Sequence, residues 1–151
     1  MARADKSFPE TKLQALLPEH IGAWTRVKLG NPLTGSDHDV APEMRAQYAR
    51  GDARVDVEVL DVGKAATLAA QAAARAAAAA TQPAGERFYR SHGHVVREEH
   101  AAGSDVSSAS VFFHNGINVR ASGRRLEGDA LRQVIEGIDL GTAAALKRRG
   151  P

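Results

Sequence analysis

Apolar and polar residues alternate between residues 53 and 59. Val55, Val57 and Val59 alternate with Asp56 and Glu58. Because successive side chains of a strand point to opposite faces, this pattern predicts a strand over 53–62 with the valines buried and the carboxylates in water. Clean alternation of this kind is typical of an antiparallel sheet with one solvated face.

Six further segments carry strand signals. They are residues 24–29, 43–49, 86–90, 94–100, 105–114 and 116–122. The pair Asn115-Gly116 between the last two is the strongest short signal for a hairpin. In the segment 24–29, Trp24 has even parity whereas Val27 and Leu29 are odd, so the pattern leaves the register of that strand open.

Helical spacing marks three segments, at residues 11–17, 64–82 and 127–137. The second is dominated by alanine, which has the best helix propensity of all residues. Its only large aliphatic side chain is Leu68, and we expect a buried stripe that lies close to the sheet, with Lys64, Gln71 and Arg75 outside. The expected stripe is Ala65, Leu68, Ala69, Ala72, Ala76 and Ala79. Residues 139–146 are expected to pack against the last helix.

Strands grouped in two blocks, with helices between and after them, indicate the α+β class. We expect an antiparallel sheet of about six or seven strands in two blocks, covered by the alanine-rich helix and a C-terminal helix. The length of 151 residues fits one domain over 1–151, with residues 1–9 and 147–151 flexible. The predicted bulky core is Trp24, Tyr48, Val55, Val57, Val59, Leu68, Val111, Phe113, Ile117, Val119, Leu131, Val134 and Ile135.

Composition excludes some chemistry. The chain has no cysteine, so disulfides, thiolate metal sites and cysteine nucleophiles are excluded. The N-terminus lacks an apolar signal segment, and the alanine run is too weakly apolar to cross a membrane. We therefore expect a cytoplasmic protein without a membrane partner, although a chain whose signal peptide had been cleaved would show the same N-terminus.

The order of elements resembles that of the PsbP-like α/β sandwiches. The segment 16–26, with its Leu-Pro pair, Gly22-Ala23-Trp24 and Arg26, is similar to the opening of small bacterial proteins in which a tyrosine-containing strand and an acidic strand follow. Here these would hold Tyr48 and residues 56–61. The resemblance carries no catalytic residues, and it implies a binding or accessory protein rather than an enzyme.

Two groups of residues are candidates for enzyme or metal chemistry. His92 and His94, at i and i+2 on an extended segment, point to the same side and are metal candidates together with His100. The loop Ser36-Asp37-His38-Asp39 has the residue types of acid–base catalysis. We expect no cofactor, because solvated histidines and local turns also account for both groups.

Basic residues are concentrated in two short runs. The net charge is +2, from 20 basic and 18 acidic residues. Arg120, Arg124 and Arg125 form one run, and residues 147–149 form the other. A nucleic-acid binder would gather such residues on one face, whereas short basic runs are usually solvated, so we expect nucleic acid not to be the partner.

Phe112 stands out because its neighbours of the same parity are polar. With Phe113 in the core, Phe112 is expected on the solvated face, where an aromatic flanked by small polar groups resembles an interface hot spot. Ordinary exposure of a single apolar residue, or packing under the C-terminal segment, is the simpler explanation of the pattern. The predicted partner-binding residues are Phe112, Ser110, His114, Arg120, Asp56 and Glu58.

These observations favour a non-enzymatic protein-binding module that uses its exposed sheet face. One concrete form is a cytosolic immunity protein that neutralises a bacterial toxin. A small metal-binding or hydrolytic enzyme, using His92 and His94 or the loop 36–39, and a weak nucleic-acid binder are the alternatives.

Overall fold

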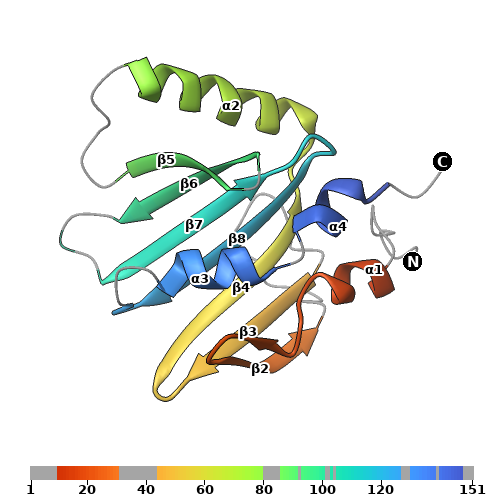
Figure 1. The fold of residues 1–151 in the computed structure, drawn as a ribbon, viewed down its shortest axis with the longest axis vertical. Coiled ribbons are helices and arrows are strands. Elements are labelled where there is room, and N and C mark those ends of the chain that lie inside the picture. The colour runs from red at the N-terminus through yellow and green to blue at the C-terminus, as the bar shows by residue number, and fades with distance from the viewer. Residues whose placement is uncertain are drawn as a thin grey trace, which may run out of the picture.

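One antiparallel sheet of eight strands organises the molecule in the computed structural model (Figure 1). The structure describes residues 10–30, 44–79, 86–91, 93–100, 103, 105–126, 130–138 and 140–147. The elements in chain order are α1 (Glu10–Ala15), β1 (His20–Ile21), β2 (Trp24–Gly30), β3 (Met44–Arg50), β4 (Ala53–Asp61), α2 (Lys64–Ala79), β5 (Glu86–Ser91), β6 (His94–His100), β7 (Val106–Phe112), β8 (Ile117–Arg124), α3 (Ala130–Gly137) and α4 (Leu140–Ala145).

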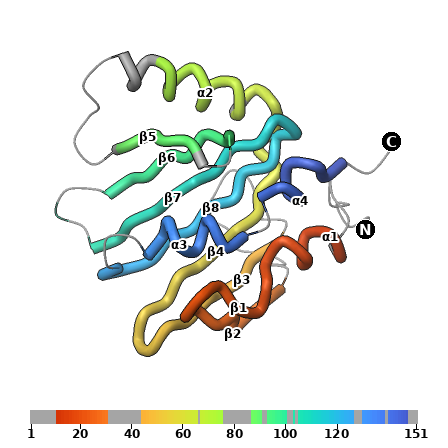
Figure 2. Tube along the Cα trace, viewed as in Figure 1, coloured from red at the N-terminus to blue at the C-terminus, as the bar shows by residue number. Residues whose placement is uncertain are grey.

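The prediction of an α+β fold with an antiparallel sheet is confirmed, but the predicted six or seven strands are fewer than the eight in the structure. The additional strand is β1, which pairs with Trp24 and Thr25 around a turn at Gly22 and lies beside β2 in the trace of Figure 2. Its two residues are too few to show a periodic pattern. Residues 140–145 also form a helix of their own, α4, beyond α3.

The sheet joins two meanders. Its strand order is β1-β2-β3-β4-β8-β7-β6-β5, so the blocks β1–β4 and β5–β8 meet at the pairing of β4 with β8. The predicted hairpin at Asn115-Gly116 is confirmed, because it links β7 to β8. Gly116 has φ of 89°, a conformation that glycine adopts easily, and the Asn115 Oδ1 accepts a hydrogen bond from the Ile117 N–H at 3.1 Å.

Helices α3 and α4 lie on the near face of the sheet in Figure 1, and we call this side the core face. α3 packs against β7, β8 and β1, and α1 contacts β3. Gly137 allows this close approach, since a Cβ there would collide with the Ile21 side chain. Every bulky residue predicted for the core is buried except Leu68.

A β-bulge resolves the parity conflict in β2. Trp24 is buried and Leu29 packs against the same core, although one is even and the other odd. The register with β3 shifts between Arg26 and Lys28, where Val27 is the extra residue. An extra residue in one strand reverses the alternation beyond it, so both apolar side chains reach the core.

The predicted buried stripe of α2 is wrong. Leu68 is 62% exposed, and Ala65, Ala69 and Ala72 are exposed too, whereas Ala76 and Ala79 lie outside the described side chains. The buried residues are instead Thr67 and Ala70. The Thr67 Oγ1 donates a 2.7 Å hydrogen bond to the Phe113 carbonyl, and this bond fixes the rotation of a helix that has almost no apolar bulk.

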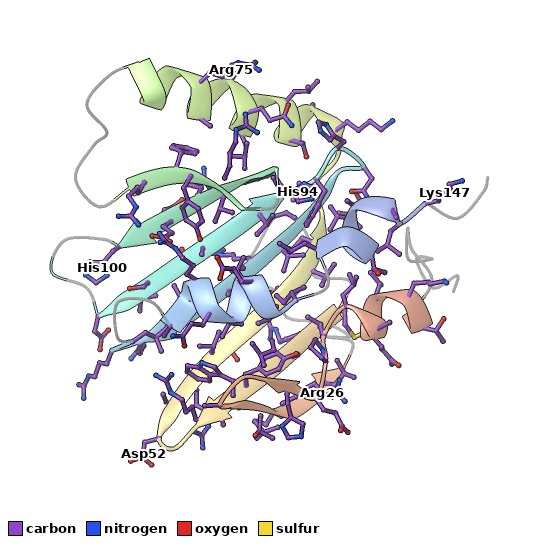
Figure 3. All side chains as sticks on the ribbon, in the orientation of Figure 1. Arg26, Asp52, Arg75, His94, His100 and Lys147 are labelled. Carbon is purple, nitrogen blue, oxygen red and sulfur yellow. The ribbon has the colours of Figure 1, made fainter. Side chains whose placement is uncertain are left out.

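Helix α2 runs along the β5 side of the sheet (Figure 1) and contacts β5, β6 and β8. It starts beside the β7–β8 turn, because the N–H groups of Val62 and Gly63 donate to the Gly116 carbonyl. Arg75 points away from the sheet in Figure 3. Of the predicted span 64–82, the described helix covers Lys64–Ala79.

Candidate functional site

The sheet has a second face, opposite the core face, because every other residue of each strand points away from the core. Pairing between neighbouring strands aligns the side chains of this second face into rows. The row nearest α2 contains Val95, Phe112, Asn118 and Leu60, all buried. The Asn118 Nδ2 donates to the Val111 carbonyl at 3.1 Å, which satisfies a buried amide. This end of the second face is therefore closed.

Phe112 belongs to the closed row, so its predicted exposure is wrong. The side chain is only 9% exposed, and the Arg97 guanidinium lies 5.7 Å from its ring centroid. Its cross-strand neighbours are Val95 and Asn118, which the local pattern around Phe112 does not reveal. An exposed hot spot at Phe112 is excluded by this burial.

The next rows carry charge. In one row Arg97, Ser110, Arg120, Glu58 and Arg45 follow one another across five strands. The next row consists of Glu99, Ser108, Ser122, Asp56, Gln47 and Lys28. Arg124, the last residue of β8, lies beyond it on the same face. We call these two rows together with Arg124 the charged face. Its residues are Lys28, Arg45, Gln47, Asp56, Glu58, Arg97, Glu99, Ser108, Ser110, Arg120, Ser122 and Arg124.

Four of the six predicted partner-binding residues come together on the charged face. Ser110 pairs with Arg120, which pairs with Glu58, and Asp56 lies in the next row. Ser110 and Glu58 are each only 7% exposed, so the predicted solvation of Glu58 is wrong and neither residue offers contact area itself. Asp56 is exposed and Arg120 is half-buried, while His114 lies in the β7–β8 turn, off this face.

Each carboxylate of the charged face has a partner. Glu58 Oε2 accepts from Arg45 Nη2 at 3.0 Å. Asp56 Oδ1 accepts from Gln47 Nε2 at 3.1 Å. Arg97 Nε lies 2.8 Å from the Glu99 carboxylate.

The cations of the charged face outnumber these carboxylates. Within the described part of the chain, Lys28, Arg120 and Arg124 make no hydrogen bond or ion pair through their side chains. Arg54, at the same end of the sheet as Arg124, donates to the carbonyls of Gly51 and Ala53. The face therefore carries unneutralised positive charge, which attracts anionic groups.

A hollow opens at the bulged end of the charged face. Its volume is about 680 Å³. The residues that line it include Val27, Lys28, Arg45, Gln47 and Asp56. The hollow was not predicted, because it depends on the bulge in β2, whose only trace in the sequence is the parity conflict between Trp24 and Leu29.

A second polar cluster joins α3 to the sheet on the core face. Arg132 Nη2 lies 3.2 Å from Glu98 Oε1, and the Arg132 guanidinium stacks 4.3 Å from the Tyr89 ring centroid. Burial raises the pKa of the Tyr89 hydroxyl, so the phenol is neutral at physiological pH. With a neutral phenol and a paired carboxylate, this cluster holds α3 in place and offers no free base.

The histidine candidates do not meet. His94 packs its ring 4.7 Å from the Phe113 ring, and His100 Nδ1 lies 2.8 Å from Ser107 Oγ. They are six positions apart, about 20 Å, and Figure 3 shows them at opposite ends of β6. Among the residues described, no group of three metal-ligating side chains is found. His92 and the loop 36–39 lie outside the described residues.

The two basic runs lie far apart. Arg124 ends β8, and Arg125, the next residue, pairs with Asp105 at 3.4 Å. Lys147 follows α4, which the Asn115 Nδ2 binds through the Ala143 carbonyl at the other end of β8 (Figure 3). Arg148 and Arg149 are outside the described residues. The residues that are described thus form no continuous basic stripe between these runs.

Comparisons with protein-family models, curated proteins and solved structures gave no match. None of the helices in the described ranges is long and apolar enough to span a membrane.

Proposed function

We propose that this chain is a non-enzymatic protein-binding module that holds an acidic partner protein on its charged face. One observation carries the proposal: each carboxylate of that face is paired, whereas Lys28, Arg120 and Arg124 have no partner among the described residues. Arg120 is central, because it lies half-buried between Ser110 and Glu58 on a firm sheet. A guanidinium in this setting binds a partner's carboxylate well.

Mixed charge favours a protein over a nucleic acid. Asp56, Glu58 and Glu99 are interleaved with the cations, and they would repel a continuous line of phosphates. A protein surface offers both signs and can match both. A toxin neutralised in the cytoplasm of a bacterium is one such partner, and the resemblance to the PsbP-like proteins agrees with a binding role.

The test uses the full chain as bait for a lysate of the native host at low and high salt. The captured protein is then purified, and its affinity is measured by calorimetry for wild type, Arg120→Gln and Arg75→Gln. Arg75 is the control, because it is an exposed arginine on α2 that points away from the sheet. We expect Arg120→Gln to weaken binding about 10-fold, or about 1.4 kcal/mol, and Arg75→Gln to leave it unchanged.

Salt gives the second readout. Affinity of wild type should fall as ionic strength rises, because exposed charges are screened. Capture of nucleic acid alone, released at high salt, would overturn the proposal in favour of nucleic-acid binding. Equal affinity of the two variants for the captured protein would show that the charged face is not the interface.

A further inference from the structure

The hollow beside β2 has the size of a ligand site. Its volume of about 680 Å³ lies within the range of ligand pockets, and the hollow is open to solvent rather than enclosed. Residues of the adjacent strands β2, β3 and β4 line it, with Gln47 and Asp56 paired in cross-strand register. Because these strands belong to one hydrogen-bonded sheet, they give the hollow a rigid base.

The bulge gives the hollow its mixed chemistry. Arg26 aligns with Tyr48 and Leu29 with Ala46, so two residues, Val27 and Lys28, stand where one would normally oppose Gln47. Val27 is 50% exposed there and supplies an apolar wall. β-Bulges often re-aim side chains at functional sites, and here the bulge places a methyl-bearing and a cationic side chain side by side.

The residues that line the hollow include two cations, Lys28 and Arg45, and one carboxylate, Asp56. Lys28 has no hydrogen bond or ion pair within the described residues. Arg45 gives one nitrogen to Glu58, yet its side chain is 47% exposed and keeps further N–H donors. The Asp56 carboxylate is already engaged by Gln47 at 3.1 Å. An incoming carboxylate would thus meet the unpaired Lys28 ammonium and the remaining N–H donors of Arg45, while the charges of Glu58 and Asp56 offset part of this attraction.

We propose that the hollow is a recognition pocket for a glutamate side chain of the partner protein. Lys28 and Arg45 bind the carboxylate, and Val27 contacts the methylene groups that carry it. This inference rests on the proposed function and adds the chemistry of one contact. Arg45 also links the pocket to Arg120, because Glu58 lies between the two arginines in one row.

The probe is an acetylated, amidated Ala-Glu-Ala-Glu-Ala peptide, titrated into the full ¹⁵N-labelled chain and followed by NMR. Its isosteric Gln-containing counterpart is the matched control for charge. We expect the Glu peptide to shift the amide signals of Val27, Lys28, Arg45 and Gln47, and the Gln peptide to leave them in place. Lys28→Ala should weaken this binding at least threefold, whereas Lys64→Ala, an exposed lysine on α2, should not.

Two outcomes would overturn the pocket: equal shifts with both peptides, or equal binding to wild type and Lys28→Ala. The failure of the pocket is distinct from that of the proposed function. A captured partner that loses affinity with Arg120→Gln but not with Lys28→Ala would retain the function and remove the pocket. Glu-specific shifts around Lys28 with no captured partner protein would retain the pocket and remove the function.

Discussion

The two faces of the sheet are stabilised by different interactions, apolar burial on the core face and polar cross-strand pairs on the charged face. On β4, Val55, Val57 and Val59 enter a core from which water is excluded, whereas Asp56 and Glu58 on the same strand enter cross-strand pairs. Apolar burial is non-directional and scales with area, so a pattern of residue types is enough to specify it. Pairing is directional, so the second face depends on which strand lies next to which. Changes on the core face should therefore cost far more stability than changes on the charged face.

The largest effect is expected for a pair of adjacent phenylalanines. Phe113→Ala should lower the free energy of unfolding by about 3–5 kcal/mol, because the side chain is fully buried on the core face. Phe112→Ala should cost less, since that side chain is 9% exposed on the second face. Urea unfolding of both variants measures the difference. An equal loss would show that the second face has a core of the same quality.

Next comes the hydrogen bond of Tyr48, whose hydroxyl donates to the Pro18 carbonyl at 2.7 Å. Tyr48→Phe should cost about 1–2 kcal/mol at pH 8, because it leaves a partly buried carbonyl without its donor. Burial raises the pKa of Tyr48 to about 12, although the nearby Arg26 charge acts in the opposite direction. The unfolded chain ionises near pH 10, so the contribution of Tyr48 is complete below pH 10 and is lost as pH rises from 10 to 12.

Urea unfolding of wild type and Tyr48→Phe at pH 8, 10 and 11.5 measures this effect. Wild type should lose its advantage over the variant across this window. Because Tyr89 is present in both proteins, its own raised pKa cancels in the comparison. A constant difference at all three pH values would contradict the assigned pKa.

A smaller effect is expected on the charged face. Glu58→Gln should cost about 1 kcal/mol, because a carboxylate that is only 9% exposed loses its charge opposite Arg45. Asp56→Asn is the matched change at an exposed carboxylate and should alter stability by less than about 0.5 kcal/mol. Thermal unfolding at low and high salt compares the two. A larger loss of stability for Asp56→Asn than for Glu58→Gln would contradict the argument that the more buried carboxylate contributes more.

The smallest effect is expected at Leu68, the residue of the predicted core that the structure places in water. Leu68→Gln should change the free energy of unfolding by less than about 0.5 kcal/mol, since its side chain is 62% exposed. Thr67→Val, one residue earlier, removes the hydrogen bond to Phe113 and provides the contrast. A loss of 2 kcal/mol or more for Leu68→Gln would show that Leu68 is buried, as the sequence pattern predicted.

Local patterns predicted what one strand can specify alone. Alternation identified the core residues of β4, β7 and β8. The pair Asn115-Gly116 identified the hairpin that joins β7 to β8. The rotation of α2 escaped prediction, because its one large aliphatic side chain, Leu68, is exposed and its buried residues are the small Thr67 and Ala70.

The candidate site was predictable only in part. Alternation correctly placed Asp56, Glu58, Ser110 and Arg120 on one face. The burial of Phe112 and the hollow at Lys28 depend on neighbours from other strands and on a bulge, and no single stretch of sequence contains that information.

The seam between β4 and β8 has a consequence for how the chain folds. Neighbouring strands within each meander follow one another along the chain, but the seam joins the first meander to the last strand of the second. Closing it restricts a long stretch of chain, and that entropy is lost before most of the core contacts can form. Folding should therefore show two fast local collapses and one slower docking step, with Val57 and Ala121, partners in the seam, reporting on the last.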